Sequence, residues 1–330
     1  MADPETAHGL ALEGLRLGYG AGATHLLCKT QSLPVTVMGL QFPNPVGMAA
    51  GMDKNGDYID ALGSLGFGFI EVGTVTPRPQ PGNPKPRIFR LEKANAMINR
   101  LGFNNKGVDH LVRQVKKHQY SGILGINIGK NFDTPNDRAA DDYLICLEKV
   151  YPYADYITVN ISSPNTRGLR DLQDAKQLDS LLATLNSKRL ALADEFHKRV
   201  PLVVKVAPDL EDKQIPDIAE VVVRNEFDGL IATNTTIARD AVKGMRHADE
   251  QGGLSGAPLK EKANHVLAGF RAHLPARIAL IGTGGITGGG DAAGKIQLGA
   301  DLVQFYTGFV YKGPDLVGDC INAIATQRSA

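Results

Sequence analysis

The chain has 330 residues, of which 43% are hydrophobic, and its formal net charge is +1. This length allows one large domain or two medium ones, and the near-neutral charge gives no reason to expect a nucleic-acid partner. Its three cysteines, Cys28, Cys146 and Cys320, are too few and too scattered for a disulfide framework or a zinc site, and they indicate buried thiols in a reducing compartment. No apolar run approaches the ~20 residues of a membrane span, and no signal peptide is visible.

The N-terminal stretch from residue 5 to residue 27 reads as a separate helical element. We expect a helix, a glycine-rich break at 18–20 and a second short helix. One face of the first helix is apolar and carries Ala7, Leu10, Ala11 and Leu15. This face either packs on the body of the protein or lies on a membrane surface. Because few Lys or Arg side chains flank it, the pattern alone favours packing.

The rest of the chain alternates strand-like and helix-like segments. Residues 35–42 alternate in polarity and contain a glycine, which predicts a hairpin at the bottom of the fold. Eight short apolar runs read as strands: 46–50, 67–72, 123–128, 156–161, 202–206, 230–232, 278–281 and 302–306. Segments with helical periodicity accompany them: 57–65, 108–118, 172–197, 215–223, 259–273, 291–298 and 316–325.

This alternation predicts an α/β protein with parallel strands. Eight strands imply closure into a (β/α)₈ TIM barrel, here with a small N-terminal helical extension. An open doubly wound sheet is the alternative, but it usually has fewer strands and a glycine-rich phosphate loop after the first one. The residues at 51–54 read Gly-Met-Asp-Lys, with no GxGxxG. We therefore expect a helical extension over residues 1–32 and a barrel domain over residues 33–330.

A long insertion follows the second predicted strand, at residues 76–100. Its five prolines, Pro77, Pro79, Pro81, Pro84 and Pro86, exclude a helix there. A long irregular segment in a compact domain is more often a functional lid than filler. We therefore expect this insertion to cover a site.

The fourth predicted strand ends in Asn160-Ile161-Ser162-Ser163-Pro164-Asn165-Thr166. Taken alone, this sequence is equally consistent with a turn and with a site, because its amides and hydroxyls could hold a flat polar ligand and move a proton. Active sites of (β/α)₈ enzymes lie at the carboxyl ends of the strands, and almost every strand here ends in polar residues. These residues are Lys54, Thr74, Thr76, Asn127, Lys130, Lys205, Thr233, Asn234, Thr235, Thr236, Thr283, Tyr306 and Thr307. The pattern favours the site.

Lys205 is the least expected of these residues, because it lies inside an apolar strand between Val204 and Val206. An unpaired buried ammonium is costly, so its position predicts an anionic or electron-rich partner. The alternative is that the side chain snorkels to the barrel mouth.

Glycine-rich segments follow the last three strands, at 252–256, 282–285 and 306–308. The loops after strands seven and eight form the usual phosphate site of this barrel, and glycines allow close approach of the backbone. No histidine stands at a strand end, and HExxH motifs and carboxylate pairs at the mouth are absent, which argues against a metal site and glycosidase chemistry. A phosphate-bearing cofactor, a buried lysine and several asparagines are typical of flavin chemistry.

Six motifs on these strands and loops resemble the dihydroorotate dehydrogenase family, and specifically its membrane-associated, quinone-reducing class. The resemblance runs from about Pro4 to the end of the chain. The motifs are AAGMDK at 49–54, GTVTPRPQ at 73–80, NRLGFNN at 99–105, GINIGK at 125–130, NISSPNT at 160–166 and ATNT at 232–235. The resemblance implies a tightly bound FMN and oxidation of dihydroorotate to orotate in pyrimidine biosynthesis.

The resemblance also assigns roles to individual residues. It makes Ser163 the base that removes the C5 proton while hydride passes from C6 to flavin N5, and we hypothesise that Thr166 holds a relay water and that Phe103 seals both from solvent. Substrate would be bound by Lys54, Asn99, Asn160, Asn165, Asn234 and Thr235, with Arg100, Leu101, Gly102 and Phe103 closing over it. FMN would be bound by Ala50, Gly51, Met52, Asp53, Lys54, Thr74, Asn127, Asn160, Lys205 and Thr233, and its phosphate by Gly256, Gly285, Tyr306 and Thr307.

The class within the family rests on Ser163, because the soluble fumarate- or NAD-linked classes carry Cys at this position. The quinone class also has an N-terminal helical extension, which residues 5–27 resemble. This implies a peripheral membrane protein, on the cytoplasmic face of the inner membrane if bacterial, with quinone entering beside the extension, and a monomer. Two departures stand out: the first turn of the extension is not found, and Arg167 replaces an expected small residue or proline, where it either alters loop closure or points to solvent. A non-catalytic phosphate-binding barrel is the third alternative.

Overall fold

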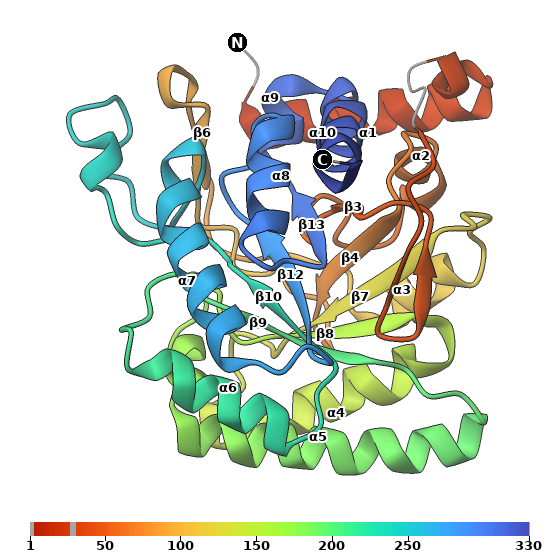
Figure 1. Ribbon diagram of the computed structural model, residues 1–330, viewed down its shortest axis with the longest axis vertical. Helices are drawn as coiled ribbons and strands as arrows, with labels where there is room; N and C mark the ends of the chain where they lie inside the picture. Colours follow the sequence, from red (N-terminus) through yellow and green to blue (C-terminus); the bar gives the residue numbers. More distant parts are fainter. Residues whose placement is uncertain (1–2, 27–30, 330) are drawn as a thin grey trace.

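The computed structural model describes residues 3–26 and 31–329. Eight parallel strands close into a barrel surrounded by helices, as Figure 1 shows, so the predicted TIM barrel is confirmed and the open sheet is wrong. Around the barrel, the strands are β3 (Val46–Met48), β4 (Phe69–Val75), β7 (Ile123–Ile128), β8 (Tyr156–Asn160), β9 (Leu202–Val206), β10 (Gly229–Ala232), β12 (Ala279–Thr283) and β13 (Leu302–Phe305). Leu27 and Cys28, for which we expected a helix end and a buried thiol, lie outside the described residues.

The outer helices are α2 (Ile59–Gly63), α3 (Val108–Val115), α4 (Ala139–Val150), α5 (Ala175–Phe196), α6 (Gln214–Arg224), α7 (Lys260–His273), α8 (Gly289–Gln297), α9 (Thr307–Lys312) and α10 (Asp315–Ser329). The predicted helix over 172–197 is divided, because Asp174 accepts hydrogen bonds from the N–H groups of Lys176 and Gln177 and so begins α5. Helix α4 was not predicted, although its buried Tyr143, Cys146, Leu147 and Val150 have helical spacing.

The barrel interior changes from apolar to polar along the strands. At the bottom, the predicted hairpin is present as β1 (Val35–Val37) and β2 (Leu40–Phe42), and Phe42 packs against Phe69 and Tyr156. Two residues further along β4 and β8, the buried side chains are Glu71 and Thr158. Because alternate residues of a strand face the same side, the polar layer lies directly above the apolar one.

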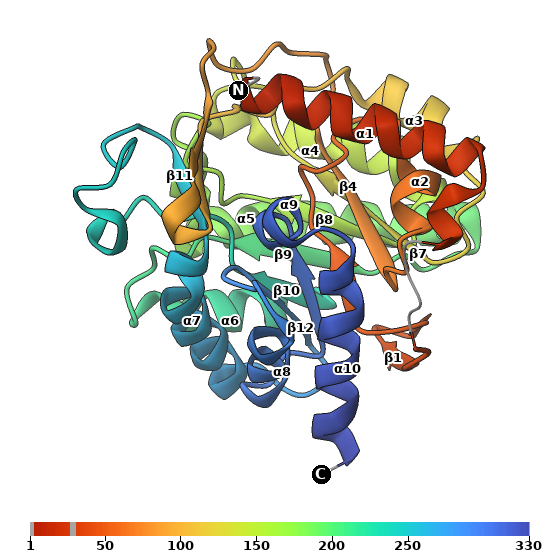
Figure 2. The ribbon, with the colours of Figure 1, turned by 90° about the horizontal axis from the view of Figure 1, so that it is seen from above.

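The insertion at 76–100 is less irregular than predicted. It contains the hairpin β5 (Ile88–Leu91) and β6 (Ala96–Asn99), and β6 pairs with β11 (Gly253–Gly256) from the loop after β10. The resulting three-stranded sheet lies to one side of the barrel in Figure 2. The expectation of an irregular segment is wrong for residues 88–99, which form two strands and a 3-10 turn at Glu92–Ala94, because pairing with the distant β11 satisfies backbone N–H and C=O groups. Asn99, at the end of β6, lines the cavity described below.

The N-terminal extension begins with α1 (Pro4–Gly20), followed by a short 3-10 helix at Ala23–Leu26. The break expected at 18–20 comes later, because Gly18 is helical and the turn is made at Gly22, which has φ of 73°. Helix α1 runs along one side of the molecule in Figure 2 and contacts α2 and β5. Among the described helices, none is long and apolar enough to cross a membrane.

Tight packing of the barrel bottom gives a stability prediction. A Cβ atom on Gly47 in β3 would lie 2.2 Å from the Phe69 ring. We expect Gly47→Val to lower the free energy of unfolding by about 2 kcal/mol, since overpacking strains a full core. Gly294→Ala in α8 is the matched control: its Cβ would meet no atom within 4 Å, and Ala should raise the helix stability by about 1 kcal/mol. Urea unfolding followed by circular dichroism checks both, and an unchanged midpoint for Gly47→Val would contradict the packing described.

Candidate active site

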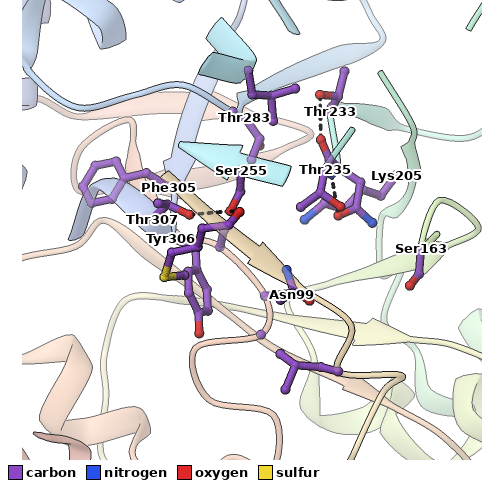
Figure 3. A pocket seen from close by; sticks show the side chains of 18 of the residues that line it. Asn99, Ser163, Lys205, Thr233, Thr235, Ser255, Thr283, Phe305, Tyr306 and Thr307 are labelled. Atoms are coloured by element: carbon purple, nitrogen blue, oxygen red, sulfur yellow. Dashed lines mark hydrogen bonds between the residues drawn. The ribbon is translucent and has the colours of Figure 1, made fainter. Parts of the chain in front are cut away.

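A cavity opens at the carboxyl ends of the barrel strands, against the sheet formed by β5, β6 and β11. Figure 3 shows Ser163 on one side of it and Tyr306 on another, with Asn99 between them. Most residues predicted for the site line this cavity: Ala50, Gly51, Lys54, Thr74, Asn99, Leu101, Gly102, Phe103, Asn160, Ser163, Asn165, Lys205, Thr233, Asn234, Thr235, Gly256, Gly285, Tyr306 and Thr307. Four of the polar strand-end residues, Thr76, Asn127, Lys130 and Thr236, do not line it, so the strand-end pattern identified most of this surface and also some residues outside it.

Five predicted residues lie outside this lining: Met52, Asp53, Arg100, Asn127 and Thr166. Asp53 accepts hydrogen bonds from three backbone N–H groups and so shapes the loop next to Lys54. Arg100 forms an ion pair of 2.7 Å with Glu250. Asn127 is buried beneath the lining. The roles assigned to these five residues stay predictions.

The Ser163 loop is held from two sides. Ser163 is 5% exposed, and its Oγ accepts a hydrogen bond of 3.2 Å from the N–H group of Asn165. The Asn165 Nδ2 donates to the carbonyl of Asn99 at 3.0 Å, which ties the loop to β6. These contacts fix the Ser163 hydroxyl at the cavity wall.

Arg170 provides the second anchor, which the sequence analysis missed. Its Nε donates to the Ser162 carbonyl at 3.0 Å, and its Nη2 donates to the Thr235 carbonyl at 2.8 Å. Asp209 orients the guanidinium through a contact of 2.8 Å. Arg170 thereby joins the loop after β8 to the loop after β10. No local pattern could have identified it, because its partners are distant in sequence.

Thr166 and Arg167 end the loop in opposite environments. The Thr166 hydroxyl is buried, and within the described part of the chain it has no hydrogen-bond partner. A buried hydroxyl without a protein partner is typical of a site for ordered water. The sequence left open whether Arg167 alters loop closure or points to solvent. Its side chain is exposed, so it points to solvent.

Two lysines face the cavity without protein partners. Lys205 is 5% exposed, so the expectation of a buried rather than snorkelling side chain is confirmed. Neither Lys205 nor the half-buried Lys54 makes a hydrogen bond or ion pair with any described residue. Burial lowers the pKa of Lys54 to about 8, and burial also lowers the pKa of Lys205. Unpaired cations at a cavity wall favour an anionic or electron-rich ligand.

A network of amides forms the floor of the cavity. The Thr74 hydroxyl donates to Asn127 Oδ1 at 2.6 Å, and Asn160 Nδ2 donates to the Thr74 hydroxyl at 2.9 Å. Asn127 Nδ2 donates to Glu71 at 2.7 Å. Glu71 was not predicted, because it stands in a run that otherwise reads as a uniformly apolar buried strand.

A cradle of small residues forms the end of the cavity near β12 and β13. Gly285 has φ of 79°, and a Cβ there would lie 2.3 Å from the Lys260 backbone. The N–H groups of Gly284 and Gly285 have no acceptor among the described residues, and neither does the buried Thr283 hydroxyl. Free N–H groups around a glycine turn are suited to an anion such as a phosphate. Across residues 3–26 and 31–329, no cluster of three His, Cys, Asp or Glu side chains could hold a metal.

The sheet and the adjacent loops contribute further wall residues, to which no individual role was assigned from the sequence, although Thr283, Gly284 and Gly308 lie in segments named there. They are Ala49, Ile88, Met97, Pro164, Ser255, Leu259, Thr283, Gly284, Ile286, Phe305 and Gly308. The alternation of polarity in residues 88–91 and 96–99 could have predicted two strands. Their pairing with β11 could not be predicted, because β11 is distant in the sequence.

Helix α1 reaches the Tyr306 side of the cavity. His8 hydrogen-bonds the Met52 carbonyl at 3.1 Å, and its ring lies 6.3 Å from that of Tyr306. Burial and the nearby Lys54 ammonium lower the pKa of His8 to about 4, so the ring is neutral at pH 7. Glu5 forms an ion pair of 2.6 Å with Arg87. The extension therefore packs against Tyr306, a residue of the cavity wall.

Comparison with known proteins agrees with this geometry. The dihydroorotate dehydrogenase family model matches residues 32–327. The dihydroorotate dehydrogenase (quinone) of Azotobacter vinelandii is 57% identical over 326 residues, covering 98% of this chain and 94% of that protein, and the one of Bordetella parapertussis is 58% identical over 327 residues, with the same coverage. The crystal structure of DHODH from Eimeria tenella in complex with ferulenol superposes with a TM-score of 0.90 at 38% identity, covering 99% of this chain and 92% of that one. The chain belongs to the dihydroorotate dehydrogenase family.

Proposed function

We propose that this protein is a quinone-dependent dihydroorotate dehydrogenase that oxidises dihydroorotate to orotate with a bound FMN. The observation that carries the proposal is a cavity lined both by Ser163 and by two lysines that have no partner among the described residues. The relatives described above are named as quinone enzymes, which favours this class over the soluble fumarate- or NAD-linked classes.

The free donors of the cavity fit FMN. The cradle of Gly256, Gly285, Tyr306 and Thr307 would hold the phosphate, because its glycines leave room for close approach and unpaired N–H groups stand beside them. Lys205 would supply positive charge beside the ring system. When bound, FMN would accept the hydride that leaves the substrate. The remaining assigned residues, Ala50, Gly51, Met52, Asp53, Thr74, Asn127, Asn160 and Thr233, would line or support the ring.

The substrate fits the other part of the cavity. Lys54 would pair with the carboxylate, and the asparagines would supply both donors and acceptors for a planar ring with alternating carbonyl and N–H groups. These residues are Asn99, Asn160, Asn165 and Asn234, with Thr235 beside them. The run from Arg100 to Phe103 would close over the bound substrate.

Ser163 would take the proton. None of the described residues that line the cavity is a His, Asp or Glu, and the two lysines of the lining are assigned to the substrate carboxylate and the flavin, which leaves Ser163 as the proton acceptor. A serine hydroxyl is a weak base and needs help from its surroundings. The unpartnered hydroxyl of Thr166 supports a water that relays the proton away, and Phe103, which lines the cavity, would exclude bulk solvent.

Anaerobic mixing with dihydroorotate tests this assignment. We expect the purified protein to show a flavin absorbance band that bleaches on mixing. Ser163→Ala should slow bleaching by about 10²- to 10⁴-fold in a single turnover with FMN still bound, and Ser163→Cys should retain part of the rate. Near-normal bleaching by Ser163→Ala would contradict the role of Ser163. A colourless wild-type protein would favour a non-catalytic phosphate-binding barrel.

The lowered pKa of Lys54 gives a pH prediction. Below a pKa of about 8 the ammonium attracts the orotate carboxylate, and above it the neutral amine does not. Orotate should therefore bind about tenfold more weakly at pH 9 than at pH 7, measured by perturbation of the flavin spectrum. Lys54→Met should bind weakly at both pH values. If orotate affinity of Lys54→Met still falls between pH 7 and pH 9, the titrating group is a different residue.

We also propose that residues 1–32 form an extension that contacts the membrane surface and admits quinone, on a monomer bound peripherally at the cytoplasmic face of the inner membrane if the source is bacterial. Leu10 and Leu17 support the contact, because each is 66% exposed and they lie two turns apart on α1. The contact of His8 with Met52 brings this helix to the cavity.

This proposal predicts different effects on the two half-reactions, which are reduction of FMN by dihydroorotate and reoxidation of FMN by quinone. The double variant Leu10→Glu/Leu17→Glu should reoxidise several-fold more slowly with a long-chain quinone in phosphatidylcholine vesicles, because the charged face no longer inserts. Bleaching by dihydroorotate and reoxidation by a short-chain, water-soluble quinone should not change. Leu190→Glu, at a leucine of α5 that is 51% exposed, is the matched control and should behave as wild type. Equal loss with both quinones would count against membrane contact through α1.

A further inference from the structure

Beneath the cavity floor, the barrel holds a carboxylate that the proposed reaction does not use. Glu71 on β4 is fully buried. Its Oε1 accepts a hydrogen bond of 2.7 Å from Asn127 Nδ2, and its Oε2 accepts from the hydroxyls of Tyr156 and Thr158 at 3.0 and 3.1 Å. A buried carboxylate without partners would be strongly destabilising, and these three donors offset only part of that cost.

Lys205 supplies the opposite charge. It is a buried cation on β9, and Glu71 is the charged group that opposes the effect of burial on its pKa. The two side chains form no contact ion pair among those the structure describes, so the ammonium stays available to a ligand while the carboxylate balances its charge from below. Two charges inside a protein act on each other without direct contact, because the interior screens them weakly.

Glu71 also determines which way the amides above it face. Because a carboxylate only accepts, Asn127 must point its Nδ2 downward and its Oδ1 toward Thr74 and Asn160. Asn160 then donates to Asn127 and accepts from the N–H and hydroxyl of Ser162 at 3.2 and 3.0 Å. A continuous series of oriented hydrogen bonds therefore connects the barrel interior to the residue next to Ser163.

We infer that Glu71 is a positioning residue that keeps the charge beneath the flavin balanced against Lys205 and fixes the amides of Asn127 and Asn160. This inference rests on the proposed FMN site. Its consequence is electrostatic: without Glu71 the Lys205 charge is unbalanced and favours the additional negative charge of reduced FMN. Without Lys205, the negative charge of Glu71 disfavours the additional negative charge of reduced FMN.

Redox titration of the FMN-loaded full chain tests the inference. Glu71→Gln should shift the equilibrium between oxidised and reduced FMN about tenfold toward the reduced form, which is ~30 mV for a two-electron couple. Lys205→Gln should shift it about tenfold the other way. The double variant Glu71→Gln/Lys205→Gln removes both charges, so its equilibrium between oxidised and reduced FMN should lie within about threefold of the wild-type value. Tyr156→Phe, which removes one hydrogen bond but keeps the carboxylate, should stay within about twofold.

The outcomes separate this inference from the proposed function. A yellow wild type that dihydroorotate bleaches, together with a Glu71→Gln potential equal to wild type, overturns the inference alone. A colourless wild type overturns the proposed function and the inference with it. If Glu71→Gln does not fold, the FMN potential of the double variant is compared with that of Lys205→Gln. A shift of about tenfold toward reduced FMN in the double variant, relative to Lys205→Gln, supports the inference. Equal potentials of these two variants overturn it.

Discussion

The structure depends on placing a charged layer inside an apolar barrel. The hairpin of β1 and β2 closes the bottom over Phe69 and Tyr156, and two residues further up β4 and β8 the interior already contains Glu71 and Thr158. Polar groups so deep must be bonded or compensated. Glu71 accepts hydrogen bonds from three donors, whereas Lys205 has no hydrogen-bond or ion-pair partner within residues 3–26 and 31–329. The space above Lys205 is therefore where the fold accommodates a ligand.

The walls of that space come from segments far apart in the sequence. The sheet of β5, β6 and β11 forms one wall, and Asn165 and Arg170 tie the Ser163 loop to that sheet and to the end of β10. Helix α1 approaches from the Tyr306 side through His8. The proposed function places proton removal and electron transfer to quinone on different sides of one cavity, as a two-stage reaction requires.

The sequence allowed accurate prediction of most features whose signal is local. Eight apolar runs with polar ends predicted the barrel, and Asn160, Ser163 and Lys205 were recognised because they interrupt or end such runs. Helix α4 and the strands β5 and β6 were missed although their periodicity is local. The misses at the site have a different physical cause, which is long-range contact. Pairing of β6 with β11 joins residues more than 150 positions apart, and Arg170 acts through carbonyls of two other loops. Glu71 looked like part of an apolar strand, since only the closed barrel shows that its side of β4 faces inward among polar partners.

A crystal structure of the protein with FMN and orotate bound tests the central claim most directly. We predict that Lys205 Nζ contacts the flavin ring, that Lys54 Nζ contacts the orotate carboxylate, and that Glu71 keeps its hydrogen bond to Asn127. A flavin bound outside this cavity would contradict the account. So would a Lys205 side chain turned away from the ligand to form a contact ion pair with Glu71.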